Sequence, residues 1–318
     1  MGPQPQSVEE LEINLDDGIR LYAEAYGDRH ADLTVVLLHG WTLDRRTWRR
    51  QLPELAGQVC APVRVVAYDA RGHGMSSPIS RRTATLARLG DDLAQVVEQA
   101  AGNGAVVLVG HSLGGMTIME YAHRHAEAFA ARVAGMVMVS TTAEGHNHTR
   151  YGLPPALGHL VRAAELSSTY VLARCGERHP HRAVMNAIRP AMRWLLFGDQ
   201  CDPDDLWLAS SAVARASLRS IGGFRASIST QQRLETLAAL AGVPCAVLVG
   251  DRDRLTPPPC AEGIAAALGG APGQVELTIC PNAGHMLMME RPDEVTAAIA
   301  QVCQAAAGRV GQGLESAA

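Results

Sequence analysis

Short runs rich in apolar residues recur along the chain and alternate with stretches of helical periodicity. Six runs of this kind are present: Leu33–Leu38, Val63–Tyr68, Ala105–Val109, Val133–Val139, Cys245–Val249 and Val275–Ile279. A strand that is buried on both faces of a parallel sheet is apolar along its length, so each run predicts such a strand. Strands that alternate with helices indicate βαβ units. We therefore expect an α/β fold, with a mostly parallel twisted sheet and helices on both of its faces.

The beginning of the chain has a different pattern. Polar and apolar residues alternate in Leu11–Leu15 and in Ile19–Tyr26, on either side of Asp16-Asp17-Gly18. Alternation around a short turn that contains glycine is typical of a β-hairpin. This hairpin is expected to precede the parallel part of the sheet.

A long segment in the second half of the chain interrupts the alternation. Between Ser140 and Leu240 no strand-like run occurs, whereas helical patterns cover 160–172, 183–197 and 204–221. About 100 residues without structure are implausible inside a compact domain, so we expect a helical insertion over the carboxyl ends of the strands. The expected domains are a core of 1–142 and 236–308, a cap or lid of 143–235, and a flexible tail of 309–318, which is rich in Gly and Ala.

The pentapeptide Gly110-His111-Ser112-Leu113-Gly114 lies between an expected strand and an expected helix. A serine with glycines two residues before and two after it, at such a junction, is the nucleophile-elbow pattern. Glycine suits the tight turn because it has no Cβ atom. The pattern predicts a serine hydroxyl that projects at the carboxyl end of a strand.

A serine hydroxyl needs a base to remove its proton, and the base needs a carboxylate to orient it. In this type of fold the chain order is serine, then acid, then histidine. Asp251 and Asp253 follow the fifth expected strand and His285 follows the sixth, while Glu144 follows the fourth. The acid and the base are thus expected at the sheet edge where ligands bind in open α/β folds.

Together with His39-Gly40-Trp41 and the segment from Asp69 to Gly74, these motifs resemble the serine-type α/β-hydrolases, particularly lipases and esterases, over 11–307. The resemblance implies Ser112 as nucleophile, His285 as general base and then acid, and Asp253, three residues after Gly250, as the residue that orients it. Asp251 and Glu144 remain less favoured alternatives. The resemblance also implies backbone N–H donors at Trp41 and Leu113 for the oxyanion. Trp41, Leu113 and Met286 are expected to contact the substrate.

The expected reaction is hydrolysis of a lipophilic carboxylic ester through an acyl-enzyme, without a cofactor. Relatives of this type also include carbon–carbon bond hydrolases, lactonases, thioesterases, lyases and perhydrolases, and a ligand-binding protein that is not an enzyme can share the scaffold. Dehalogenases and most epoxide hydrolases of the superfamily use an aspartate nucleophile, so Ser112 argues against both.

Composition restricts the class of protein further. The 318 residues carry a formal net charge of −4 and include arginine but no lysine, a bias typical of a bacterial genome of high GC content. Nothing indicates a nucleic-acid partner, a secretion signal or a membrane span. The seven scattered cysteines suggest reduced thiols and a cytoplasmic protein. His39, His73 and His111 are expected to bond backbone groups. The pairs His146/His148 and His179/His181 lack the accompanying ligands of a metal site.

Overall fold

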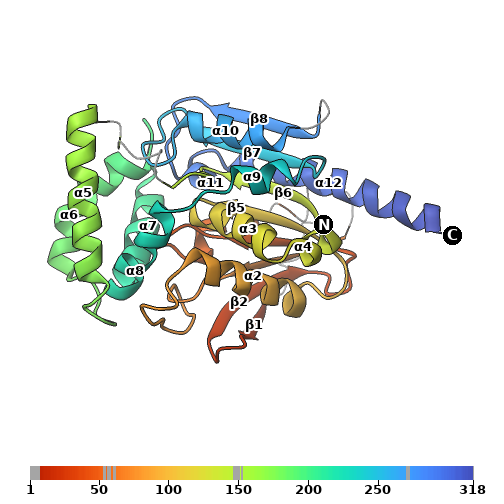
Figure 1. Ribbon diagram of the computed structural model, residues 1–318, viewed down its shortest axis with the longest axis horizontal. Helices are drawn as coiled ribbons and strands as arrows, with labels where there is room; N and C mark the ends of the chain where they lie inside the picture. The colour runs from red at the N-terminus through yellow and green to blue at the C-terminus, as the bar shows by residue number, and fades with distance from the viewer. Residues whose placement is uncertain are drawn as a thin grey trace, which may run out of the picture.

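The computed structural model describes residues 8–52, 55, 59, 62–145, 151, 153–269 and 273–317. Within these residues the chain forms one eight-stranded sheet with the order β1-β2-β4-β3-β5-β6-β7-β8 (Figure 1). The strands are β1 (Glu9–Asn14), β2 (Arg20–Gly27), β3 (Leu33–Leu38), β4 (Val63–Tyr68), β5 (Ala105–His111), β6 (Val133–Val139), β7 (Cys245–Gly250) and β8 (Val275–Cys280). The predicted hairpin and the six predicted strands are confirmed.

Strand β3 lies between β4 and β5 in the parallel part of the sheet. Val36 is in register with Val66 of β4 on one side and with Leu108 of β5 on the other. In the spatial order β4-β3-β5-β6-β7-β8, each strand is parallel to its neighbours. Strand β2 instead pairs antiparallel with both β1 and β4. Every residue of β3, β4 and β7 is buried, as continuous apolar runs require.

Successive residues of the central strands face opposite sides of the sheet and form two separate cores. Val36 and Leu108 pack with α2 (Leu86–Ala100), α3 (Leu113–Arg124) and α10 (Pro258–Leu268) on one face. Val35 and Val107 pack with the long helix α12 (Pro292–Ala317) on the other face. The period of two residues along a strand therefore distributes the helices over both faces.

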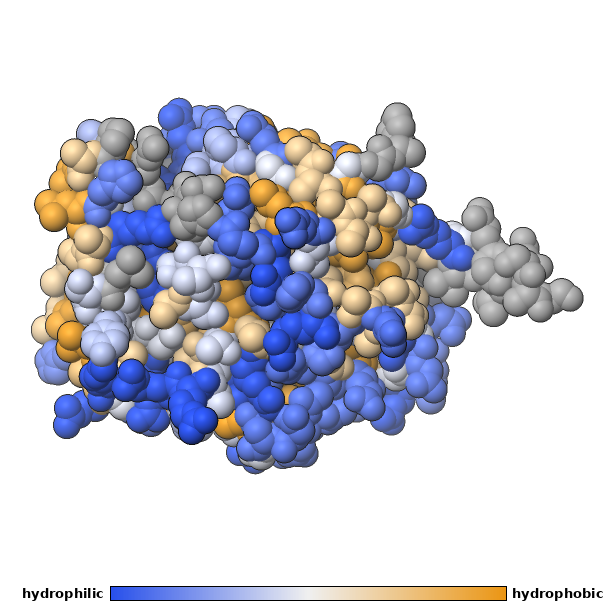
Figure 2. Space-filling model, viewed as in Figure 1, coloured by the Kyte–Doolittle hydropathy of each residue, from blue (hydrophilic) through white to orange (hydrophobic). Residues whose placement is uncertain are grey.

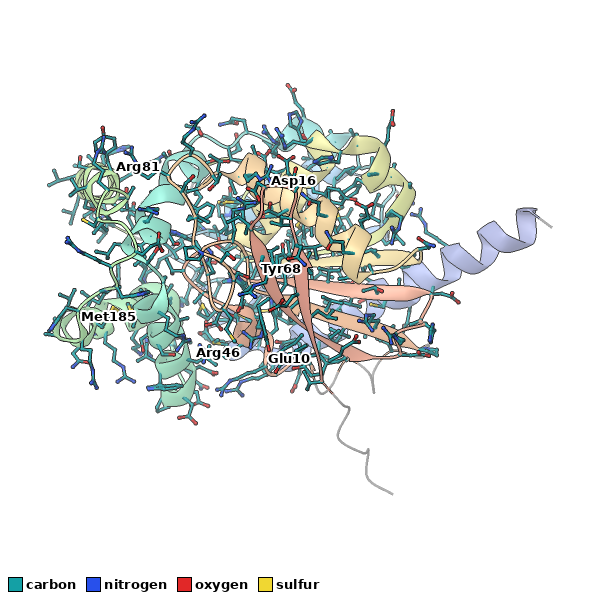
Figure 3. All side chains as sticks on the ribbon, turned by 90° about the horizontal axis from the view of Figure 1, so that it is seen from below. Glu10, Asp16, Arg46, Tyr68, Arg81 and Met185 are labelled. Carbon is teal, nitrogen blue, oxygen red and sulfur yellow. The ribbon has the colours of Figure 1, made fainter. Side chains whose placement is uncertain are left out.

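The insertion between β6 and β7 is helical, as expected. It contains α5 (Pro155–Leu172), α6 (Arg182–Leu196), α7 (Pro203–Arg215) and α8 (Leu218–Ser229). Figure 1 shows these helices together at one end of the sheet, and Figure 3 places Met185 of α6 at the same end, away from Glu10 and Tyr68 in the sheet. We call α5–α8 the cap. The short helix α9 (Leu234–Ala238) follows it.

Two expectations about helices need correction. The helical pattern over 204–221 is divided into α7 and α8, because Ser217 has an extended backbone and its hydroxyl accepts the Ser220 N–H as the N-cap of α8. The expected flexible tail 309–318 is helical as far as Ala317, where α12 projects from the body of the protein (Figure 1). That segment contains no proline to end the helix.

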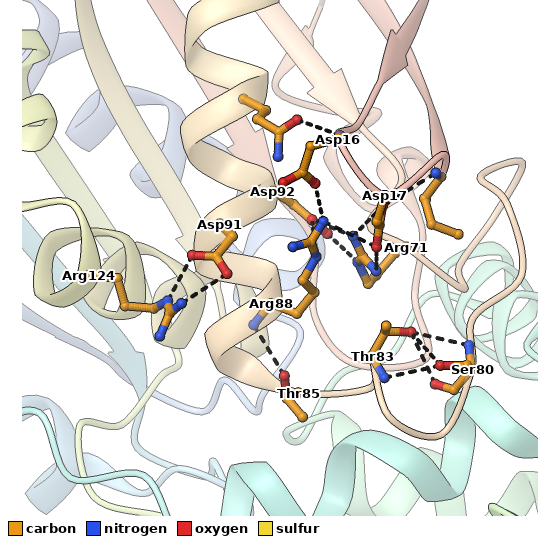
Figure 4. Close-up of polar contacts among 12 residues, drawn as sticks. Asp16, Asp17, Arg71, Ser80, Thr83, Thr85, Arg88, Asp91, Asp92 and Arg124 are labelled. Atoms are coloured by element: carbon orange, nitrogen blue, oxygen red, sulfur yellow. Dashed lines mark hydrogen bonds and ion pairs between the residues drawn. The ribbon is translucent and has the colours of Figure 1, made fainter.

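A buried ion-pair network fixes the loop after β4. Arg71 donates to both carboxylate oxygens of Asp92 at 2.5 Å and to Asp17 of the hairpin turn at 2.9 Å (Figure 4). Arg71 and Asp92 are almost completely buried. The loop is thus tied both to helix α2 and to the β1–β2 turn.

Candidate active site

Ser112 occupies a strained turn at the carboxyl end of β5. Its backbone has φ 52° and ψ −112°, a combination that L-residues rarely adopt, and α3 begins at the next residue. Neighbouring strand ends hold the turn: the Ser112 N–H donates to the Val139 carbonyl at 3.0 Å, and the Thr141 hydroxyl donates to the Ser112 carbonyl at 2.7 Å. The predicted strand–turn–helix context of this serine is therefore present.

The two glycines of the elbow are required by close backbone contacts. A Cβ atom on Gly114 would lie 2.4 Å from the carbonyl oxygen of Leu38, and one on Gly110 would lie 2.5 Å from Gly115 N. Both distances are far shorter than real carbon contacts. Replacing either glycine would force α3 away from the sheet, so the glycines place the serine by allowing close approach.

His285 and Asp253 come from the loops after β8 and β7 and meet beneath the cap. The His285 Nδ1–H donates to Asp253 Oδ2 at 2.9 Å, and both side chains are buried. Asp253 also accepts the N–H groups of Leu255 and Thr256 at 2.8 Å each and the Thr256 hydroxyl at 2.9 Å. The carboxylate is held from several sides, so it can fix the orientation of the imidazole ring.

The electrostatic environment keeps Asp253 ionised. Burial alone would raise the pKa of Asp253, but the His285 ring and the hydrogen bonds from His285 and Thr256 outweigh it and hold the pKa below its ordinary value. The alternative acids lie elsewhere. The Asp251 side chain is exposed, and its Oδ1 atom lies 3.9 Å from Arg252 Nε. Glu144 forms an isolated backbone bridge with Gln232.

Backbone contacts hold the His285 loop in place. The His285 N–H donates to the Leu196 carbonyl at the end of α6 at 2.8 Å. The His285 carbonyl accepts a hydrogen bond from His111 Nε2 at 3.0 Å, next to Ser112. Burial lowers the pKa of His111 well below its ordinary value, so this ring is neutral. His111 therefore joins the serine elbow to the histidine loop.

Ser112 and His285 both line a cavity of about 430 Å³ under the cap. Their side chains make no direct hydrogen bond in the described structure. In free enzymes such a bond is often long and tightens when substrate binds. Most other lining residues are apolar: Trp41, Leu43, Leu153, Val161, Ile188, Ala191, Met192, Trp194, Leu195, Leu196, Val213, Leu255 and Met286. A second cavity of about 60 Å³ shares Ser112 and Trp41 with the first as lining residues.

The expected contact residues divide between these cavities. Trp41 lines both, Met286 lines the larger one, and Leu113 lines the smaller one. Leu287, Met288 and Met289 are buried in the same core as Met286 but line neither cavity. The backbone N–H groups of Trp41 and Leu113 have no hydrogen-bond acceptor in the described part of the chain. Both amides are therefore free to bind an oxyanion.

The remaining histidines near the site bond backbone groups, as expected. His39 Nε2 accepts the Ala70 N–H at 2.9 Å, and its Nδ1–H donates to the Gly40 carbonyl. His73 Nε2 accepts the Thr42 N–H at 3.1 Å. Burial lowers the pKa of His73 to about 3, so its ring is neutral and can accept this bond. These contacts brace the loop that carries Trp41.

Neither His179 nor His181 lines the two cavities at Ser112. His179 and His181 are exposed in the cap, and His181 caps α6, while His146 and His148 lie outside the described residues. No group of three histidine, cysteine or acidic side chains within the described ranges is arranged to hold a metal ion. None of the helices described is both long and apolar enough to cross a bilayer.

Sequence reasoning missed two features of the site. Thr256 contacts both Asp253 and, at 3.3 Å, His285 Nδ1. Glu165, Arg225 and Tyr151 bring a polar cluster into the otherwise apolar cavity walls. Thr256 lies three residues after Asp253, a spacing that suggests a local turn. Glu165 and Arg225 are 60 residues apart on two cap helices and carry no local signal.

Comparison with known proteins agrees with this architecture. A model of the alpha/beta hydrolase family matches residues 35–298. Epoxide hydrolase A of Mycobacterium tuberculosis is 28% identical over 89% of this chain and 94% of its own length. A bifunctional esterase/perhydrolase of Acinetobacter calcoaceticus is 34% identical over 36% of this chain and 39% of its own. Among solved structures, a thermophilic esterase of Thermogutta terrifontis is 26% identical, with a TM-score of 0.70 and coverage of 92% and 96%.

Proposed function

The chain belongs to the alpha/beta hydrolase family, and we propose that it is a serine hydrolase that cleaves a lipophilic carboxylic ester through an acyl-enzyme. The observation that carries this proposal is the convergence of Ser112 and the Asp253-bound His285 on one apolar cavity. A positioned nucleophile, a base and an orienting acid are the parts that acyl transfer needs.

In the proposed first step, Ser112 Oγ attacks the ester carbonyl carbon and His285 Nε2 takes the hydroxyl proton. The Asp253 carboxylate stabilises the imidazolium through Nδ1. The N–H groups of Trp41 and Leu113 bind the negative oxygen of the tetrahedral intermediate. The C–O bond to the alcohol then breaks, and the imidazolium gives its proton to the leaving alkoxide.

In the second step, His285 removes a proton from water, which attacks the acyl carbon. The tetrahedral intermediate collapses, and the proton returns to Ser112 Oγ as the carboxylic acid leaves. The enzyme is restored without a cofactor, because both steps use the same base and the same oxyanion donors.

The cavity and its rim support a lipophilic substrate. Val161, Ile188 and Trp194 line the larger cavity and are also 37%, 38% and 41% exposed at the surface. Apolar surface is visible on the cap at the left of Figure 2. An apolar wall that continues from the surface to the nucleophile favours a ligand with substantial hydrocarbon.

An epoxide hydrolase is the second candidate, because one such enzyme resembles nearly the whole chain. Ser112 stands where most epoxide hydrolases of the superfamily have aspartate, and this favours the ester reaction. An alkyl-enzyme ester formed on aspartate can be hydrolysed at its carbonyl, whereas an ether formed on serine has no carbonyl for water to attack.

The test is pre-steady-state hydrolysis of p-nitrophenyl octanoate by the wild type and by Ser112→Ala. We expect a burst of about one p-nitrophenol per active site from the wild type. The variant should show no burst, and its turnover should be lower by roughly 10⁴-fold or more. Styrene oxide is assayed in parallel. An undiminished burst in the variant, or turnover of the epoxide but not of the ester, would contradict the proposal.

A further inference from the structure

Two cavities of unequal size meet at Ser112. The larger, of about 430 Å³, is lined mostly by apolar residues, and the smaller has about 60 Å³. The smaller cavity suits a group of a few non-hydrogen atoms, since one water molecule takes up about 30 Å³ in the liquid. Ser112 and Trp41 line both. A substrate whose carbonyl group is bound at Ser112 could therefore place one part in the larger space and another part in the smaller one.

A charged cluster from the cap forms one wall of the smaller cavity. Arg225 of α8 donates from Nε to Glu165 Oε1 of α5 at 2.7 Å and from Nη2 to Oε2 at 3.1 Å. The Tyr151 hydroxyl donates to Glu165 Oε2. Arg225 and Tyr151 are buried, whereas the Glu165 side chain keeps 25% of its surface exposed. Glu165 thus keeps accessible surface and lines both cavities.

The cluster offers a ligand both a hydrogen-bond acceptor, on Glu165, and a hydrogen-bond donor, on Arg225. Burial, and then Glu165, raises the pKa of the Tyr151 hydroxyl to about 12, so it keeps its proton and uses it on Glu165. Glu165 Oε1 accepts one bond, from Arg225, and a carboxylate oxygen has room for a second. The guanidinium balances the carboxylate charge. The buried Arg225 Nη1 group has no hydrogen-bond partner in the described structure and can in turn donate to a ligand. The cavity therefore suits a neutral group that both donates and accepts hydrogen bonds, such as a hydroxyl, rather than a cation.

We propose that the substrate is an ester with one large apolar part and one short part that carries a hydroxyl group, and that Glu165 accepts a hydrogen bond from that hydroxyl. This inference rests on the proposed ester hydrolysis at Ser112. Glu165 is then a specificity-determining residue, and Arg225 and Tyr151 hold it in position. The apolar part occupies the larger cavity.

The competing explanation is that the ion pair between Glu165 and Arg225 serves only to hold α5 against α8. A buried ion pair is a poor source of stability, because desolvation offsets much of the attraction. Another ion pair of the cap, between Arg219 of α8 and Glu177 at 2.8 Å, is much more exposed and lines neither cavity. Glu177→Gln is therefore a matched control for effects on the cap alone.

The experiment compares two pairs of esters in which a hydroxyl replaces a methyl group of similar size. Octyl glycolate and octyl propionate vary the short acyl part, and 2-hydroxyethyl octanoate and propyl octanoate vary the short alcohol part. We expect the wild type to prefer the hydroxylated member of one pair by roughly tenfold or more in kcat/KM, as a hydrogen bond to a charged acceptor implies. Absence of a preference in both pairs would overturn the inference.

The variant is Glu165→Leu/Arg225→Met, which removes both charges together and leaves neither buried alone. It should lose the preference, so that kcat/KM for the hydroxylated member falls by roughly tenfold or more relative to kcat/KM for the apolar member. Glu177→Gln should keep the preference. If the double variant loses activity equally on both members, or retains the preference, the cluster is structural only and the inference is wrong.

Binding to Ser112→Ala, measured by calorimetry with the same esters, separates the inference from the proposed reaction. The hydroxylated ester should bind roughly tenfold more tightly than its partner, and Glu165→Leu/Arg225→Met in this background should abolish the difference. If the wild type hydrolyses none of the four esters, the proposed function fails, and the ratio of the Kd values still decides the inference. Equal Kd values would overturn it.

Discussion

The Nδ1 atom of His285 lies 2.9 Å from Oδ2 of Asp253, and the two side chains are 4% and 0% exposed. Their loops follow β8 and β7, which are neighbouring parallel strands. An Nδ1–H held by a carboxylate leaves Nε2 as the basic nitrogen of the ring. This tautomer is the one that can take a proton from Ser112, so the contact determines which nitrogen is available for catalysis.

We expect Asp253→Asn to lower kcat for ester hydrolysis by roughly 10⁴-fold with little change in stability. The amide can turn its NH₂ group toward Nδ1 and favour the wrong tautomer. Steady-state kinetics and thermal unfolding measure the two effects. Asp251→Asn is the matched control, because Asp251 is exposed two residues away and does not contact His285. A comparable loss of kcat in the control, or none in Asp253→Asn, would contradict the assignment.

Gly114→Ala should disrupt the elbow. Its Cβ would lie 2.4 Å from the Leu38 carbonyl oxygen, so α3 must move away from β3. We expect a loss of several kcal/mol in the free energy of unfolding, as overpacking costs about 1–3 kcal/mol even where no backbone atom blocks the new group. Urea unfolding and burst amplitude provide the measurements.

The control for Gly114→Ala is Gly263→Ala, which also adds one methyl group to a helix. Nothing lies within 4 Å of a Cβ at Gly263 in α10. This variant should be more stable than the wild type by up to about 1 kcal/mol, because alanine has the higher helix propensity. Equal stability of the two variants would show that the close approach at Gly114 is unimportant.

Asp92→Asn should destabilise the protein by about 3 kcal/mol, because it leaves the buried Arg71 guanidinium without its main counter-charge. Burial raises the pKa of Asp92 to about 6, so unfolding is measured at pH 8, where the carboxylate is ionised. Asp91→Asn is the neighbouring control. Asp91 pairs with the half-exposed Arg124 at the surface (Figure 4), and its loss should cost under about 1 kcal/mol. Similar costs for both variants would contradict the role of burial.

His73 should make the protein less stable in mild acid. Its pKa is lowered to about 3 in the folded protein, against 6.5 for the ordinary residue, so the unfolded chain binds the proton first. The stability that His73 contributes is complete above about pH 6.5 and falls as the pH drops toward 3. Between pH 7 and pH 5 the loss is about 2 kcal/mol.

The measurement is the free energy of urea unfolding at pH 7 and pH 5. His73→Gln, which retains an acceptor for the Thr42 N–H, should lose about 2 kcal/mol less than the wild type over this interval. His179→Gln alters an exposed histidine and should show the dependence of the wild type. A His73→Gln protein with unchanged pH dependence would refute the neutral, buried state of His73.

Much of the fold could be predicted from local patterns. The apolar runs predicted the bounds of β3, β4 and β6 residue for residue, because a strand buried on both faces consists mostly of apolar side chains. The spacing of Gly110, Ser112 and Gly114 predicted the elbow, because only a glycine can approach a neighbouring backbone so closely. At helix ends the patterns were less reliable, as the division at Ser217 and the extension of α12 to Ala317 show.

The residue types at the ends of the strands, and hence the candidates Ser112, Asp253 and His285, follow from local patterns in the chain. The folded structure is needed to show that Asp253 rather than Asp251 contacts His285, because that choice depends on a side-chain distance across two loops. It also decided the shape and polarity of the cavities. Glu165 and Arg225 meet because α5 and α8 pack together, and helix packing over a separation of 60 residues leaves no local pattern in the chain.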